Sequence, residues 1–404
     1  MQRTGISAMR VGLPRREFMR ETAAVVCGSV LAPVVALAQE SGKPPSVVSI
    51  PPRQWGPGAA PTIYPDPDII AIDPSFNELM LGITAIRRLW TGSRWAEGPA
   101  WSSQGRYLVF SDVQDDTQYR YLWENGAVTV FRRPSFNSNG NSFDFQGRQI
   151  SAQHFYRRVV RWEHDGSMTV IADSFEGKHL NSPNDLVPHT DGSIWFTDPP
   201  YGTRLSEGHP DIAGGPSNPQ GVFNPRIGSE NADAFGGQKR ELPTNVYRWD
   251  PSGKLERAVG EDQLPDPNGL CFSPDYKTLY VASTGKGPGD RGSGGRGVIH
   301  AFDVQGTRLA NQRIFADMTV EGVHCGPDGL RADVTGRVWC SSNAPLGYAG
   351  VLVFNPQGKL IGRIRLPEVA ANLAFGGPKR DRLFITASQS LYVLQVQTQG
   401  ASPG

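Results

Sequence analysis

The chain has 404 residues, with 40 Lys and Arg against 39 Asp and Glu, which gives a formal net charge of +1 at pH 7. This balance argues against nucleic acid or an anionic membrane surface as a partner, because both require a field of positive charge. The 47 glycines and 33 prolines have no collagen-like period and fit a chain with many tight turns, which favours an all-β fold.

Residues 1–38 have the pattern of a twin-arginine signal peptide. The pair Arg15-Arg16 is followed by Phe18 and a weakly apolar stretch, and Ala36-Leu37-Ala38 is a small-residue cleavage site. The stretch is too short and mixed for a spanning helix, so we expect no stable membrane insertion. We expect the twin-arginine export machinery as a partner and a soluble periplasmic or secreted chain that begins at Gln39. The alternative is a short N-terminal helix with a chance arginine pair.

Residues 39–83 are expected to form an extended N-terminal arm that contains one short helix. The arm is rich in proline up to about residue 70. Asp73 and Pro74 predict the start of the helix, because Asp favours the N-cap and Pro the first turn.

The three cysteines after the leader are too few for a disulfide framework. They are Cys271, Cys325 and Cys340, and they lack the spacing of a zinc site. One bridge among them stays open, and the sequence does not choose the pair.

Residues 84–397 contain a sequence motif that occurs six times. Each copy has a polar residue, a turn and then an apolar strand-like run. The copies begin at Glu97, Asn139, Asn184, Asn268, Asp328 and Asn372. Their spacings are 42, 45, 84, 60 and 44 residues, and the shorter ones have the size of a four-stranded propeller blade.

These repeats predict an all-β fold, a six-bladed β-propeller of four-stranded blades. The sixth copy ends with its third strand, Ser390 to Val396, and the apolar run Thr84 to Trp90 is left over at the other end. We therefore predict that this N-terminal strand becomes the outer strand of the last blade and closes the ring, which removes an open sheet edge. Residues 398–404 form a C-terminal tail.

The polar residue that leads each repeat suggests a metal site. The repeat places all six residues around one axis, and converging oxygen atoms suit a hard divalent cation. Glu97 and Asp328 supply two carboxylates, and Glu97 stands in an apolar setting where an unpaired charge is costly. The alternative is ordinary turn chemistry, since Asn and Asp before Gly are common in turns. This alternative is strongest for Asn139 and Asn372.

Three further features lie outside the repeat signature. His154 is expected to open a strand in the second copy, where it could face the pore and bind substrate, or could be a structural histidine. Insertions at residues 202–242 and 284–296 fall between the second and third strands of the third and fourth copies. Long loops of this kind often cover or form binding sites, so we expect them to roof the pore, with a plain surface insertion as the alternative. The pair Arg157-Arg158 is interpreted as a solvated turn.

Six motifs resemble those of the gluconolactonase, or senescence-marker-protein (regucalcin), family of propeller lactonases. The motifs are Trp95–Trp101, Glu176–Asp185, Trp195–Gly202, Pro267–Leu270, Pro327–Leu330 and Asn372–Gly377. The resemblance covers about residues 70–397, and the bacterial gluconolactonase branch is the closer likeness. The animal branch has an arginine where this chain has Ser182, so substrate details of the animal proteins do not transfer.

The resemblance implies the metal-dependent hydrolysis of a sugar lactone to an aldonic acid. It implies that Glu97, Asn268 and Asp328 hold one divalent cation. Asn184 is expected to complete this metal set and to act with Asp328 as a catalytic residue, through contact with the substrate or the water on that cation. Asp328 would activate water. Ca²⁺ is the first expectation for the cation, and Mg²⁺, Mn²⁺, Zn²⁺ and Fe²⁺ are alternatives.

The expected substrate contacts come from four side chains around the same axis. They are Asn139, His154, Asn184 and Asn268. Two other functions stay open: a different metal-dependent propeller esterase of the paraoxonase kind, and a non-catalytic propeller that binds a sugar or a protein.

Overall fold

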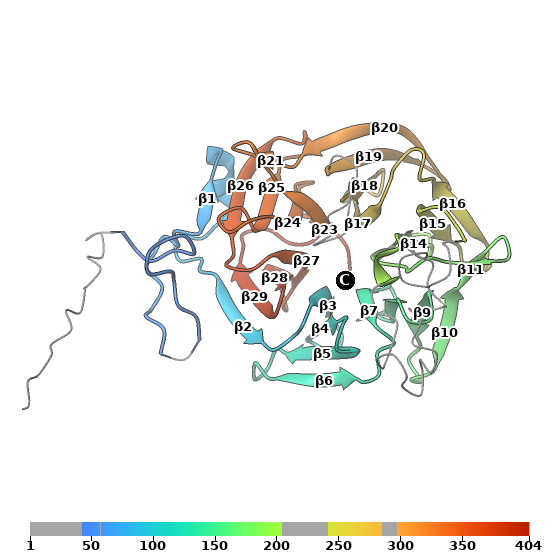
Figure 1. The fold of residues 1–404 in the computed structure, drawn as a ribbon, viewed down its shortest axis with the longest axis horizontal. Helices are drawn as coiled ribbons and strands as arrows, with labels where there is room; N and C mark the ends of the chain where they lie inside the picture. The colour runs from blue at the N-terminus through green and yellow to red at the C-terminus, as the bar shows by residue number, and fades with distance from the viewer. Residues whose placement is uncertain (1–42, 57, 204–240, 285–296, 404) are drawn as a thin grey trace, which may run out of the picture. The chain divides into compact units, whose positions relative to one another are not determined.

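The computed structural model describes residues 43–56, 58–203, 241–284 and 297–403. These residues form the predicted six-bladed β-propeller, which Figure 1 shows down its axis. The signal peptide expected in residues 1–38 lies outside the described residues. Within them, no helix combines the length and apolar character that crossing a membrane requires.

Each of the first three blades is an antiparallel sheet whose strands follow chain order from the axis to the rim. Blade one contains β3 (Ala96–Ser102), β4 (Tyr107–Asp112), β5 (Thr117–Leu122) and β6 (Val128–Arg132). Blade two contains β7 (Ser138–Phe143), β8 (Gln149–Gln153), β9 (Arg158–Trp162) and β10 (Met168–Ala172). Blade three contains β13 (Leu186–Pro188), β14 (Ile194–Asp198), β15 (Asn245–Trp249) and β16 (Leu255–Val259).

The other three blades repeat this order, and the last one joins both ends of the propeller. Blade four contains β17 (Pro267–Phe272), β18 (Thr278–Ser283), β19 (Val298–Gln305) and β20 (Arg308–Asp317). Blade five contains β23 (Gly326–Ala332), β24 (Val338–Asn343), β25 (Gly350–Phe354) and β26 (Leu360–Arg365). Blade six contains β27 (Ala370–Gly376), β28 (Arg382–Ala387), β29 (Ser390–Gln395) and β2 (Arg87–Thr91). The predicted closure of the ring by an N-terminal strand is confirmed, since β2 pairs with β29.

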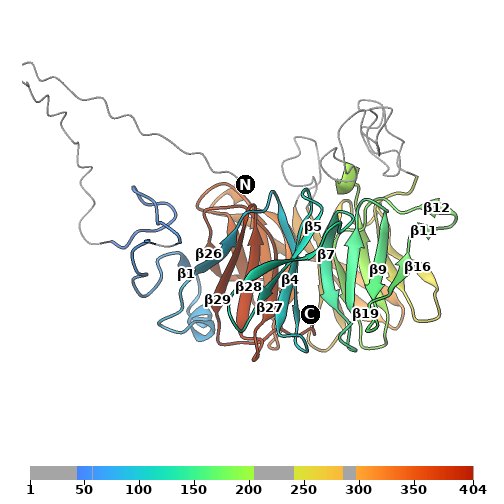
Figure 2. The same cartoon turned by 90° about the horizontal axis from the view of Figure 1, so that it is seen from below.

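Short elements lie between and beside the blades. Two small hairpins, β11 (Ser174–Phe175) with β12 (Lys178–His179) and β21 (Thr319–Val320) with β22 (Val323–His324), precede the innermost strands of blades three and five. A 3-10 turn, η2 (Tyr201–Thr203), follows β14. The side view in Figure 2 shows that the blade strands run between the two faces of the ring.

The segment before β2 is tied to blade five. Its 3-10 helix η1 (Pro74–Leu79) is capped by Asp73, whose carboxylate accepts a hydrogen bond from Ser75 N at 3.0 Å. The strand β1 (Ile69–Ala71) pairs with β26, which gives blade five a fifth strand that the repeats do not predict. The backbone of β1 therefore pairs with the outer edge of β26, which would otherwise be unpaired.

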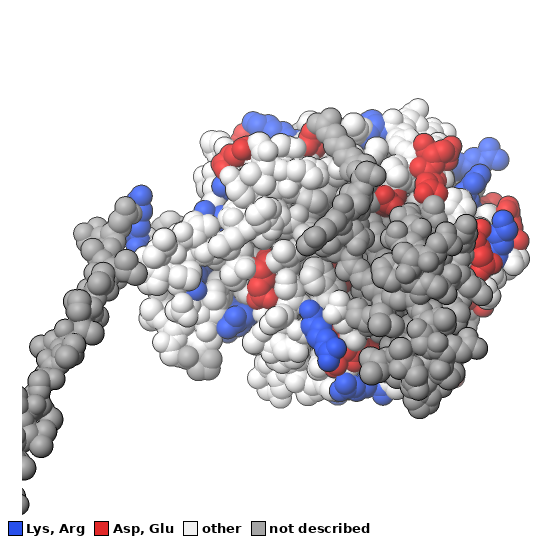
Figure 3. Space-filling model, in the orientation of Figure 1, with Lys and Arg blue, Asp and Glu red and all other residues white. Residues whose placement is uncertain are grey.

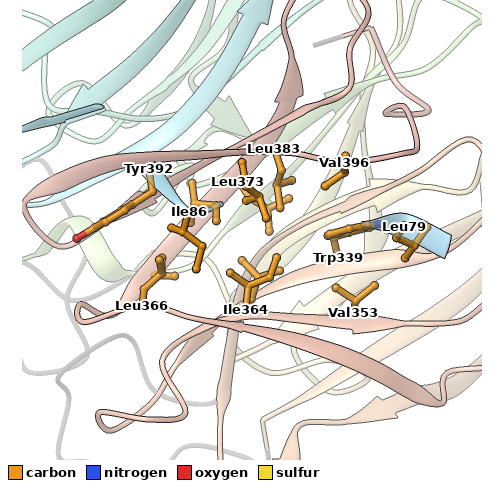
Figure 4. Packing of buried hydrophobic residues seen from close by; sticks show 14 of the residues in the cluster. Leu79, Ile86, Trp339, Val353, Ile364, Leu366, Leu373, Leu383, Tyr392 and Val396 are labelled. Carbon is orange, nitrogen blue, oxygen red and sulfur yellow. The ribbon is translucent and has the colours of Figure 1, made fainter. Parts of the chain in front are cut away.

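The core lies between adjacent blades, as expected for an element that cannot bury its faces alone. The indole of Trp101 in blade one stacks on Phe384 in blade six, with ring centroids 6.0 Å apart. Trp339 in blade five meets Phe375 in blade six edge to face, at 5.6 Å. Figure 4 shows the cluster around Trp339 between blades five and six. The three cysteines that the structure describes are free and buried in such interfaces.

The charge distribution agrees with the balanced composition. On the described part of the face in Figure 3, Lys and Arg lie in small groups interspersed with Asp and Glu.

Candidate active site

All six repeat-leading residues are buried at the same end of their repeats. Five of them lie near the beginning of an innermost strand: Glu97 in β3, Asn139 in β7, Asn268 in β17, Asp328 in β23 and Asn372 in β27. Asn184 lies two residues before β13. Their exposed fractions lie between 1% and 6%. The innermost strands surround the axis in Figure 1, so the repeat brings these side chains to one end of the central channel.

Neighbouring blades approach each other very closely at this end. A Cβ atom on Gly98 would lie 2.0 Å from the carbonyl oxygen of Asn139, and one on Gly269 would lie 2.3 Å from that of Asp328. Gly98 also has a φ of +48°, in the left-handed region that favours glycine. The glycine after the polar residue therefore lets adjacent backbones meet, which brings the polar side chains together.

The innermost strands have irregular register where they carry these polar residues. The ladder shifts between Glu97 and Ala100, Ser138 and Asn141, Pro267 and Leu270, and Pro327 and Leu330. Such bulges change the direction of a side chain and are common beside active sites. Hydroxyl groups on the second strands satisfy nearby carbonyls: Ser111 Oγ donates to Asn139 O (2.9 Å), Ser341 Oγ to Gly329 O (3.1 Å) and Thr386 Oγ1 to Asn372 O (3.2 Å).

The carboxyl group of Asp328 lies among other acids. Burial, and then the charges of Glu97 and Asp185, raise the pKa of Asp328 well above its usual range. A hydrogen bond from the side-chain amide of Asn268 opposes this rise. Asp328 Oδ2 has no hydrogen-bond partner among the described residues. Buried carboxylates in this arrangement are stable only when a proton or a cation neutralises them.

Asn139 and Asn184 are held by the backbones of adjacent blades. Asn184 N donates to Thr197 O at 2.9 Å, and Asn184 O accepts from Gly140 N at 2.8 Å. The side-chain oxygen of Asn139 is buried and has no hydrogen-bond partner among the described residues. Both residues therefore have a defined backbone, and Asn139 has an oxygen available for a ligand.

The interpretation of Arg157 as part of a solvated turn is wrong. Its side chain is 2% exposed, and it binds the segment that leads to Asn184. Arg157 Nε donates to the carbonyls of Leu180 and Asn181, the latter at 3.2 Å, and Nη2 donates to His179 O at 3.4 Å. A buried guanidinium thus holds three consecutive carbonyl groups, which a sequence cannot distinguish from a surface arginine.

His154 is completely buried beside the beginning of the first insertion. It follows β8 directly and does not open a strand as predicted, because the chain turns there. A Cβ on Gly202 would lie 2.8 Å from the Cβ atoms of both His154 and Ser182. Ser182 Oγ accepts a hydrogen bond from Gly202 N at 2.9 Å. Most of the 202–242 and 284–296 insertions lies outside the described residues, so their role over the pore stays a prediction.

The sequence matches the SMP-30/Gluconolactonase/LRE-like region family over residues 95–389. The chain belongs to this family. A gluconolactonase of Zymomonas mobilis is 29% identical over 356 residues, which cover 82% of this chain and 87% of that relative. A pentonolactonase of Haloferax volcanii is 24% identical over 314 residues, with 76% and 86% covered. A solved gluconolactonase structure from Xanthomonas campestris has 34% identity and a TM-score of 0.65, and the match covers 83% of this chain and 98% of that one.

In this SMP-30/gluconolactonase chain, the oxygen atoms at the end of the channel fit a divalent cation. No cluster of three or more His, Cys, Asp or Glu with metal-site geometry occurs in the described part of the chain. The candidate set is different, since it joins two carboxylates, Glu97 and Asp328, to amides. Asn268 donates its amide N–H to Asp328, which leaves its carbonyl oxygen for a cation. Such an all-oxygen donor set suits Ca²⁺, Mg²⁺ or Mn²⁺.

Two buried residues that contact the surroundings of these candidates were not predicted from the sequence. Arg331 Nη1 lies 3.1 Å from Asp185 Oδ2 in an ion pair that joins blades five and three. Asn141 holds the backbones that carry Glu97 and Asn139. A charged residue three positions after Asp328, between the apolar residues Leu330 and Ala332, was the available signal for Arg331.

Proposed function

We propose that this chain hydrolyses a sugar lactone to the aldonic acid and that Glu97, Asn268 and Asp328 hold one divalent cation for this reaction. The observation that carries the proposal is the pair of buried acids, Glu97 and Asp328, from blades one and five of a gluconolactonase-family propeller. The charge of Glu97 raises the pKa of Asp328, and a cation between the two would offset this effect. The names of relatives that share most of their length with this chain, a gluconolactonase and a pentonolactonase, support an aldonolactone as substrate.

The proposed mechanism assigns one task to each side chain. A bound divalent cation supplies a positive charge that polarises the lactone carbonyl and acidifies water. Asp328 accepts a proton from the attacking water and returns it to the ring oxygen when the acyl–oxygen bond breaks, so no net proton is consumed before the acid ionises. Asn184, Asn139 and His154 orient the ring hydroxyls.

The burial of the site assists both steps. Glu97 and Asp328 are 3% and 1% exposed, and charge interactions are stronger at such buried positions than in water. Without a cation, burial and then the neighbouring acids raise the pKa of Asp328; a cation beside it would favour the ionised carboxylate that can accept a proton. Ca²⁺ is the proposed ion, and Mg²⁺, Mn²⁺, Zn²⁺ or Fe²⁺ are tested alongside it.

The decisive experiment measures acid release from glucono-δ-lactone and from γ-aldonolactones by the chain that starts at Gln39. The protein is stripped with chelator and then reloaded with each cation in turn. We expect activity to disappear on stripping and return on reloading. Asp328→Asn should lower kcat by about 10²–10⁴-fold under saturating cation, the range of general-base catalysis. Full activity in Asp328→Asn would show that another base is used.

The same assay includes a matched control variant and distinguishes two rival functions. Glu124→Gln changes an exposed acid paired with Arg106 and should keep wild-type activity. A preference for aryl esters over aldonolactones would favour a paraoxonase-like esterase. Binding of a sugar or protein without turnover by the reloaded protein would favour a non-catalytic propeller.

We also propose that residues 1–38 direct twin-arginine export and that the mature chain is periplasmic or secreted. Support comes from the order of the arginine pair, apolar stretch and cleavage site in the sequence. N-terminal sequencing of the exported protein should give Gln39, and substitution of Arg15-Arg16 by Lys-Lys should retain the precursor inside the cell.

A further inference from the structure

A buried ion pair joins blades three and five close in the chain to two candidate cation ligands, Asn184 and Asp328. Asp185 lies directly before β13 in blade three, and Arg331 lies in β23 of blade five. Arg331 Nη1 is 3.1 Å from Asp185 Oδ2, and the two side chains are 4% and 0% exposed. Blade four stands between these blades in the ring, so the pair joins two blades that are not neighbours.

Asp185 has little freedom to turn. Its Oδ1 accepts a hydrogen bond from Leu186 N at 2.9 Å, and its backbone N and O bond to Thr197 at 3.2 Å and 3.0 Å. A Cβ on Gly140 of blade two would lie 2.9 Å from Oδ1. Asn184 is the adjacent residue, so whatever holds Asp185 also limits the direction of the Asn184 amide.

The charges around Asp328 make this pair significant for a cation. Asp185 follows Asn184 directly, and Arg331 lies three residues after Asp328 in β23, so the paired charges lie beside two of the candidate ligands. Arg331 is hydrogen-bonded to Asp185 and to Leu330 O at 2.8 Å. Asp185 is thus paired with Arg331, and the two acids in the candidate ligand set, Glu97 and Asp328, have a formal charge that equals that of one divalent cation.

Stability alone gives a weak reason for such a pair. Removing two charges from water costs free energy that their attraction returns only in part, and apolar residues of similar volume often serve as well. A role in the site gives a stronger reason for it.

We propose that Arg331 is a positioning residue: it binds Asp185 away from the cation, orients the neighbouring Asn184, and leaves Glu97 and Asp328 as the two acids that hold the divalent ion. This inference rests on the cation site of the proposed function. Arg331 itself touches neither the substrate nor the cation in this scheme.

The test compares Arg331→Met, Asp185→Asn and the double variant by calorimetric titration of the stripped proteins with Ca²⁺ at pH 8. Arg331→Met leaves an extra unpaired acid and should bind Ca²⁺ at least about tenfold more tightly, whereas Asp185→Asn leaves an unpaired cation and should bind it at least about tenfold more weakly. The double variant removes both charges and should return to within about threefold of wild type. kcat should fall in Arg331→Met, because the acid that is no longer held competes for the ion.

Thermal unfolding of the same stripped proteins separates positioning from simple stabilisation. If the single variants lose melting temperature while their Ca²⁺ affinities do not move in opposite directions, the pair is only structural and the inference is wrong. Should Asp185→Asn fail to fold, Arg331→Met and the double variant still decide the question. Arg313→Met breaks the exposed pair with Asp303 and should leave Ca²⁺ affinity unchanged. Absence of any cation binding in the unmodified chain, with none of the five cations, would overturn the proposed function and this inference with it.

Discussion

Asn141 offers a direct test of how the fold supports the candidate site. It is fully buried in β7, two residues after Asn139. Its side-chain nitrogen donates to Gly98 O at 2.9 Å, to Ser111 Oγ at 2.9 Å and to Asn139 O at 3.1 Å. Its side-chain oxygen accepts hydrogen bonds from Ser151 Oγ (2.7 Å), Gln118 Nε2 (2.8 Å) and Gln149 Nε2 (3.0 Å). One amide therefore joins the backbones of blades one and two to a polar network beneath them.

The cost of Asn141→Ala follows from which partners keep another hydrogen bond. Asn139 O retains Ser111 Oγ, and Gln118 Nε2 retains Ser151 Oγ at 3.2 Å. Gly98 O loses its side-chain donor, and the Ser151 hydroxyl loses its acceptor. Two buried groups left without a partner, at roughly 1–3 kcal/mol each, predict a loss of about 4 kcal/mol in the free energy of unfolding.

Urea unfolding of the stripped protein measures this loss, and Ca²⁺ titration measures its effect on the site. Because Gly98 follows Glu97, we also expect weaker Ca²⁺ binding in Asn141→Ala. Asn125→Ala is the matched control, since Asn125 bonds only the exposed turn nitrogen of Ala127, at 3.0 Å, and should cost less than about 1 kcal/mol. If Asn141→Ala and Asn125→Ala lower the free energy of unfolding by the same small amount, the hydrogen-bond network around Asn141 does not stabilise the protein as argued.

Two further predictions concern the cation and the buried arginine. Because the pKa of Asp328 in the folded, stripped protein lies above its unfolded value near 4, ionising this group costs stability that grows as the pH rises above about 4, and a cation offsets that cost. The shift in melting temperature caused by Ca²⁺ should therefore be larger at pH 8 than at pH 5. In Asp328→Asn this pH dependence should be much smaller. If the variant keeps the same pH dependence, the effect belongs to another group. Arg157→Met should destabilise the protein by about 2–4 kcal/mol and raise KM, because three carbonyls before Asn184 lose a charged donor. Arg158, the first residue of β9, is only partly buried, so Arg158→Met should change KM by less than about threefold. Equal effects in both variants would contradict the difference in burial.

The blades could be predicted from the sequence because the propeller repeats one local pattern. The spacing from Glu97 to Asn372 gives the number of blades, and the missing fourth strand after Val396 indicates which segment closes the ring. By contrast, β1 has no counterpart in the repeat. Its pairing with β26 depends on where the arm runs over blade five, and no local pattern encodes that path.

The candidate site was predictable only to the level of one position per blade. Symmetry places Glu97 and Asp328 at the same end of the channel, and both are buried there. The partners that set their surroundings come from other positions and distant blades. The sequence alone suggests that Arg157 is a surface residue, because its carbonyl partners lie 22 to 24 positions further along the chain. Arg331 and Asp185 are 146 positions apart in the chain, so no local sequence pattern predicts their contact.

The closure of the ring by β2 has a consequence for biogenesis. Arg87 pairs with Val393, so blade six cannot be completed until almost the entire polypeptide has left the ribosome. Joining such distant segments is slow, and a prematurely terminated chain would keep an unpaired β-edge that can recruit other chains. Blade six also separates the blades that carry Glu97 and Asp328, so the spacing between these two acids is settled at the final step. Proteolytic removal of β2 should therefore abolish cation binding while most of the sheets survive.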